Sequence, residues 1–70
     1  MDNNELKEAL FNKRPVIFNM PSVGELHYKC VSAIIYRVKN GKLSVSAEIE
    51  DKCGHSVTIV DPKKIRYEEE

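Results

Sequence analysis

The sequence predicts a mainly β domain, built as a small and partly open barrel of five short strands with one N-terminal α-helix. Apolar and polar residues alternate on both sides of Asn40-Gly41, the dipeptide most typical of a two-residue β-hairpin turn. A short helical pattern precedes these strands. The 70 residues make a single domain, 1–70, and a chain of this length buries only roughly 60% of its unfolded surface.

Residues 2–13 are expected to form the helix. Asp2 and Glu5 have the spacing of a capping box. Pro15 disfavours the helical conformation at Arg14, so the helix should end before it. The apolar stripe of this helix consists of Leu6, Leu10 and Phe11. Two to three turns are marginal alone, so this stripe should pack on the β segment.

The segment 15–67 is expected to supply the strands. The order is a strand at 15–19, a loop at 20–26, a hairpin at 28–51, a strand at 55–61, a helical turn from Asp61-Pro62 and a strand at 65–67. Five strands with a helical turn before the last are typical of an SH3-like partly open barrel. A twisted four-stranded antiparallel sheet backed by the helix, an α+β fold, is the alternative.

The hairpin register follows from the turn. A two-residue turn at Asn40-Gly41 pairs residues whose numbers sum to 81, so Val38 faces Leu43. The same register gives the further pairs Tyr36–Val45, Ile34–Ala47, Ser32–Ile49, Cys30–Asp51 and Tyr28–Cys53. This face is almost wholly apolar and is the expected core face. In the following strand, Val57 and Ile59 are also expected to point inward.

The opposite hairpin face carries an apolar stripe among charged residues. Its members are Val31, Ala33 and Ile35, followed by Arg37. Three candidates could cover this stripe: the N-terminal helix, a partner protein or a second copy of the chain. We expect these four residues, or alternatively the 20–26 loop, to form a partner-binding surface on a monomer or homodimer.

The charge is balanced overall but unevenly distributed. The chain has 11 basic and 11 acidic residues, with an acidic tail at 68–70 and a mildly basic body. The nucleic-acid alternative would use Lys39, Lys42, Lys63, Lys64 and Arg66. Stacking aromatics are scarce for this role, because the register puts Tyr36 on the core face. Weak nucleic-acid binding is therefore the second function hypothesis.

Two cysteines and two histidines make a zinc site a third and more distant possibility. The set is His27, Cys30, Cys53 and His55. Two Cys with two His can form a tetrahedral zinc site, and the register brings Cys30 near Cys53. The spacings do not match paired zinc knuckles, so free thiols and ordinary histidines are the expectation, with zinc or a Cys30–Cys53 disulfide as the alternatives. We expect no cofactor, with zinc as the alternative.

Enzyme activity is not expected, because so short a chain lacks room for an enclosed cleft and a separate scaffold. There is no Gly-rich phosphate loop and no nucleophile elbow. The N-terminus lacks the apolar region of a signal peptide, and no apolar run approaches a membrane span. A cytoplasmic location without a membrane partner is the expectation.

The stretches "AIIYRVKNGKLSVSAEIEDKCG" and "GHSVTIVDPKKI" resemble short uncharacterised proteins of prophages and mobile elements in Gram-positive bacteria. The resemblance covers residues 14–67 and carries over no functional residue. It implies an accessory or regulatory protein that binds a host or phage macromolecule. Together with the apolar stripe, it predicts a non-enzymatic protein-interaction module.

Overall fold

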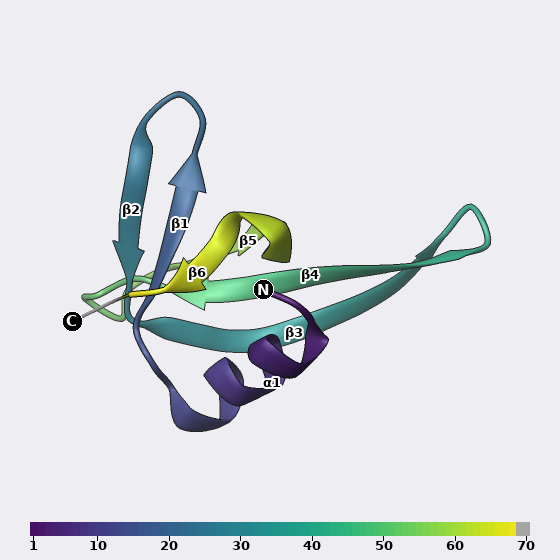
Figure 1. Cartoon of the computed structure of the whole chain (residues 1–70), viewed down its shortest axis with the longest axis horizontal. Helices are drawn as coiled ribbons and strands as arrows, with labels where there is room; N and C mark the ends of the chain where they lie inside the picture. Colours follow the sequence, from purple (N-terminus) through teal and green to yellow (C-terminus); the bar gives the residue numbers. More distant parts are fainter. Residues whose placement is uncertain (69–70) are drawn as a thin grey trace.

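The computed structural model describes residues 1–68 and shows a mainly β protein with one short N-terminal helix (Figure 1). Its elements are α1 (Asn3–Asn12), β1 (Val16–Met20), β2 (Gly24–Tyr28), β3 (Cys30–Lys39), β4 (Lys42–Glu50), β5 (Val57–Val60), the 3-10 helix η1 (Pro62–Lys64) and β6 (Ile65–Tyr67). The strands form two antiparallel three-stranded sheets, in the orders β2-β1-β6 and β3-β4-β5. The described chain is thus neither a closed barrel nor a single four-stranded sheet. Within the expected acidic tail, 69–70 lie outside the described residues.

The predicted capping box of α1 is confirmed. The Asp2 carboxylate accepts a hydrogen bond from the Glu5 backbone N–H at 2.8 Å, and the Glu5 side chain accepts one from the Asp2 N–H. The helix buries Leu6 and Ala9, whereas Phe11 is 89% exposed. Phe11 was therefore wrongly included in the buried stripe. It follows Ala9 by two positions, which is about 200° around a helix of 3.6 residues per turn.

The predicted loop at 20–26 is wrong over most of its length. Only residues 21–23 form a turn, and Gly24–Tyr28 forms β2. This strand pairs with β1 from Met20–Gly24 to Val16–Tyr28. Leu26 and Tyr28 are partly buried against the core, while Glu25 and His27 are exposed. This alternation of partly buried and exposed residues is too short to stand out in the sequence. β2 is therefore a sixth strand where five were expected.

The predicted Asn40-Gly41 turn is confirmed, with φ angles of 52° and 75°. The predicted register holds from Lys39–Lys42 as far as Ala33–Glu48. At Ser32 a β-bulge inserts one unpaired residue, so that Val31 faces Ile49 and Cys30 faces Glu50. The predicted pairs Ser32–Ile49, Cys30–Asp51 and Tyr28–Cys53 are therefore wrong.

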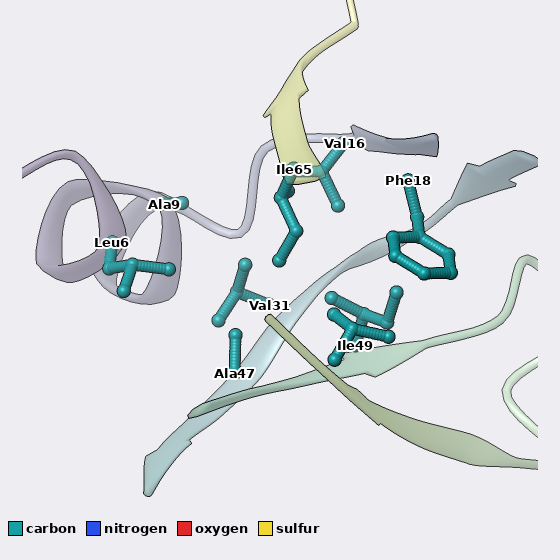
Figure 2. Packing of buried hydrophobic residues seen from close by; sticks show 9 residues of the cluster. Leu6, Ala9, Val16, Phe18, Val31, Ala47, Ile49 and Ile65 are labelled. Carbon is teal, nitrogen blue, oxygen red and sulfur yellow. The ribbon is translucent and has the colours of Figure 1, made fainter. Parts of the chain in front are cut away.

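The bulge moves Val31 from the expected outer face into the core. Val31 is 1% exposed and packs with Ile49 and Leu6 in one cluster (Figure 2). The other buried members of this cluster are Ala9, Val16, Phe18, Ala47, Val60 and Ile65. They come from α1 and from strands of both sheets, so a single small core joins all the layers.

β5 turns toward the core the face that was expected to be exposed. It pairs with β4 so that Val60 faces Ala47 and Ile59 faces Glu48. Ala47 points into the core, so Val60 is buried while Val57 and Ile59 are exposed. The predicted helical turn and final strand are confirmed. Asp61 caps η1 by accepting a hydrogen bond from the Lys63 N–H at 3.0 Å, and β6 follows directly.

Paired substitutions on β3 test the position of the bulge. Val31→Ala removes methyl groups from a fully buried site and should reduce the free energy of unfolding by about 2 kcal/mol. Val38→Ala makes the same change on the same strand, where the side chain is 76% exposed, and should cost less than about 0.5 kcal/mol. Urea denaturation of both variants measures the difference. Equal losses would contradict the bulged register.

Candidate interaction surface

The distal half of the β3-β4 hairpin extends beyond the core. We call residues 35–46 the hairpin arm. Figure 1 shows it reaching past α1 and η1 to a tip that no other element touches in that view. The last pair with a buried side chain is Ile34–Ala47, and Val45 of the next pair on that face is partly buried against the core. Beyond Val45 the two strands depend mainly on each other.

One face of the hairpin arm is an exposed continuation of the core face. Tyr36 faces Val45 and Val38 faces Leu43 across the two strands. Tyr36 is 48%, Val38 76% and Leu43 68% exposed. The sequence assigned these side chains to the correct face, but the core ends before reaching them. Their exposure is thus a consequence of a sheet that is longer than its core.

The four residues that were predicted to bind a partner do not form one exposed surface. Val31 is buried in the core and offers no surface. Ala33 and Ile35 are partly buried on the outer face of the hairpin, and Arg37 is exposed on the arm. Val57 and Ile59, which were expected inside, are exposed on the neighbouring strand. The set therefore loses Val31, and the exposed apolar side chains of the arm were missed as candidates.

The hairpin arm is basic and contains no acidic residue. Between Glu25 and Glu48 the sequence has no aspartate or glutamate, while the arm holds three basic residues. These are Arg37, Lys39 and Lys42. The ion pairs found within residues 1–68 involve Arg14, His27, Lys52 and Arg66, and so leave the arm uncompensated. The arm therefore presents apolar area together with net positive charge.

The predicted nucleic-acid set does not form one patch. Lys39 and Lys42 flank the turn at the tip of the arm, whereas Lys63 and Lys64 belong to η1 near its base (Figure 1). The guanidinium of Arg66 donates to the Glu25 carboxylate at 2.7 Å. The two lysines at the tip, together with Arg37, remain as a compact basic cluster on the hairpin arm.

A groove runs along β4 at the base of the hairpin arm. Its volume is about 740 Å³, and residues 1–3, 43–46 and 59–63 line it. One wall is the edge of β4 that faces away from β3. The other walls are the start of α1 and the turn from β5 into η1. The groove thus connects the arm to the body of the protein.

The predicted zinc ligands are dispersed. His27 bonds through Nδ1 to the Glu68 carboxylate, and the Cys30 thiol donates to Glu50 at 3.6 Å in a buried position. Cys53 and His55 are exposed in the 51–56 turn. Both cysteines are free thiols, and the part of the chain that is described brings no three metal-ligating side chains together. Burial, followed by the Glu50 carboxylate, raises the pKa of the Cys30 thiol.

The 51–56 turn owes its shape to one carboxylate. Asp51 accepts hydrogen bonds from the His55 backbone N–H and the Ser56 hydroxyl, both at 2.9 Å. The His55 N–H and then the Ser56 hydroxyl lower the pKa of Asp51 below its ordinary value of 3.8. Asp51 is therefore a turn-stabilising residue, and its hydrogen bonds explain the shift without a catalytic role.

The chain matches no protein-family model, no curated protein and no solved structure in the comparisons made. Within residues 1–68 no helix is long and apolar enough to cross a membrane.

Acid titration tests the role of Asp51. A carboxylate whose pKa is lower in the folded state adds stability above its unfolded pKa, and this stability is lost as the pH falls through the folded pKa. Asp51→Asn should therefore lower the melting temperature at pH 7, with the difference from the parent shrinking as the pH falls below 3.8. Melting curves across this range measure it. A difference that is constant with pH would contradict the account.

Proposed function

We propose that this chain is a non-enzymatic protein-interaction module that binds its partner through the hairpin arm. The exposed apolar ladder of Tyr36, Val38 and Leu43 on an uncompensated basic arm is the observation that carries the proposal. Apolar side chains gathered on one exposed face are typical of interaction sites. Their exposure in this small protein is compatible with a partner that covers them.

The apolar ladder has enough area to matter energetically. Complete burial of a valine or leucine side chain contributes about 1.5–3 kcal/mol. Val38 and Leu43 are each about two thirds or more exposed, so a partner would recover most of that contribution from each of them. Tyr36 adds an aromatic ring with a hydroxyl group, a side chain that is enriched at protein interfaces.

The positions of the titratable groups support a non-enzymatic role. Within residues 1–68 the pKa values of four groups shift, and each shift has a local structural cause. These groups are Cys30, Asp51, Tyr67 and Glu68. The Tyr67 hydroxyl donates to the Glu5 carbonyl at the helix, and Glu68 bonds to His27 and Lys52. They do not converge on the groove or on the arm.

The proposal also concerns the type of fold and the kind of protein. The order of strands, with a 3-10 turn before the last one, is compatible with an SH3-like partly open barrel. The resemblance of 14–67 to small prophage and mobile-element proteins suggests an accessory or regulatory protein. The proposed partner is another protein, and the chain binds it as a monomer or homodimer.

Nucleic acid is the second candidate partner. Arg37, Lys39 and Lys42 lie on a projecting arm, and Tyr36 is exposed, which the sequence did not predict. A basic arm with an aromatic side chain suits single-stranded nucleic acid. The apolar pairs Tyr36–Val45 and Val38–Leu43 favour protein, because phosphate contacts do not require them.

Site-specific crosslinking tests the proposed function. A photo-reactive phenylalanine analogue at Tyr36 should give a discrete protein adduct in cells that express the chain. The same analogue at Phe11, which is 89% exposed on α1, should give none. Adding Val38→Glu to the Tyr36 variant should reduce the adduct by about tenfold, because a charge then has to be buried at the contact.

A matched substitution away from the arm controls for nonspecific effects. Phe11→Glu in the Tyr36 crosslinking variant should leave the adduct unchanged. Circular dichroism should give the same spectrum for both glutamate variants. Equal loss with both variants, or an adduct that nuclease rather than protease removes, would overturn the proposed function.

A further inference from the structure

We propose that the groove beside β4 binds an extended peptide segment of the partner, which adds antiparallel to β4 as a further strand of the β3-β4-β5 sheet. This inference rests on the proposed function and specifies how the partner is bound. It is carried by an unpaired strand edge, a groove in line with β5 and the positive charge of Lys42 just beyond the distal end of that groove.

The edge of β4 is only half occupied. β5 pairs with Ala47 to Glu50 and leaves Lys42 to Ser46 without a strand on that side among residues 1–68. In an antiparallel ladder the direction of the backbone N–H and C=O groups alternates along each strand. Lys39–Lys42 closes the two-residue turn and is a hydrogen-bonded pair, so Leu43 and Val45 direct their backbone groups away from β3.

The groove continues the line of β5. The last pair of β5 is Val60–Ala47, after which Asp61 and Pro62 turn the chain into η1. Pro62 has no N–H to extend the ladder, so β5 ends there. The vacated position beside residues 43–46 belongs to the 740 Å³ groove, which is within the range of about 300–1,000 Å³ for ligand sites. A single added strand would occupy it.

The lining of the groove defines the chemistry of the peptide. Leu43 and Val45 lie on the apolar face, so the residues opposite them should be apolar. Lys42 lies just beyond the distal end of the groove and favours a carboxylate there. At the other end, the Asp2 and Asp61 carboxylates are balanced by Lys63 and by the N-terminal ammonium of Met1, which also line the groove. Antiparallel addition places the acidic residue at the C-terminal end of the peptide, opposite Lys42.

A second copy of the chain fits this edge less well. Pairing two β4 strands about a two-fold axis would set Leu43 against Val45 and Ser44 against Ser44. In that register Gly41 of each copy would meet the other copy's Ala47, whose outer edge Val60 already occupies. A short peptide with an acidic end opposite Lys42 avoids this collision and pairs the charge of Lys42.

The test uses a synthetic peptide, acetyl-Thr-Val-Thr-Val-Glu-amide, which spans the free positions from Ser46 to Lys42, and the full chain labelled with nitrogen-15. In the proposed register its two valines face Val45 and Leu43 and its glutamate faces Lys42. Titration should shift the amide signals of Leu43 and Val45 and slow their hydrogen exchange. N-methylation of either valine should weaken binding about tenfold, whereas N-methylation of the threonine opposite Ser44 should not.

Charge variants distinguish the register from general attraction. Lys42→Glu should weaken binding about threefold, while Lys7→Glu on α1 should have no effect. If the peptide shifts the signals of Tyr36 and Val38 without protecting the Leu43 and Val45 amides, strand addition is overturned and the proposed function stands. Absence of any shift on the arm overturns strand addition, and crosslinking at Tyr36 then tests the proposed function independently. Self-association that protects these amides without peptide would identify a second copy as the occupant and overturn the inference.

Discussion

The β-bulge at Ser32 is the constraint on which the rest of the structure depends. The Ser32 hydroxyl donates to the Glu48 carboxylate at 2.8 Å and lies 3.3 Å from the Glu48 carbonyl oxygen, so the inserted residue is tied to the opposite strand. The bulge changes which residues of β3 point toward the core. Val31 points inward, whereas Ala33, two residues later, points outward. Without it, the buried position beside Ile49 would be filled by a serine, and Val31 would face solvent.

The size of the core determines what remains exposed. Leu6, Val31 and Ile49 pack at the point where α1, β3 and β4 meet, and a chain of 70 residues has little apolar volume to extend that core further. The β3-β4 ladder nevertheless continues to Asn40-Gly41. Its distal pairs are therefore exposed on both faces, and they are basic. The hairpin arm, the free edge of β4 and the groove at its base all follow from this mismatch between sheet and core.

Local signals allowed much of the fold to be predicted from the sequence. The capping box, the Asn40-Gly41 turn and the Asp61-Pro62 helical turn each depend on neighbouring residues, and the structure contains all three. Tertiary features were missed. β2 forms because β1 pairs with it, and the facing of Val57 and Ile59 depends on the register with β4. A serine opposite Ile49 on the predicted core face was the one signal for the bulge. The candidate surface was misplaced for the same reason, because the extent of the core cannot be read from a strand pattern.

Native-state hydrogen exchange of the peptide-free protein at low concentration tests this account most directly. The pair Ala33–Glu48 lies beside the core and the pair Arg37–Ser44 lies on the hairpin arm, and both belong to the same ladder. The account predicts that the Ala33 and Glu48 amides exchange only through global unfolding, while those of Arg37 and Ser44 exchange faster through local opening. Equal protection of the two pairs would show that the arm unfolds together with the core, and would contradict the account.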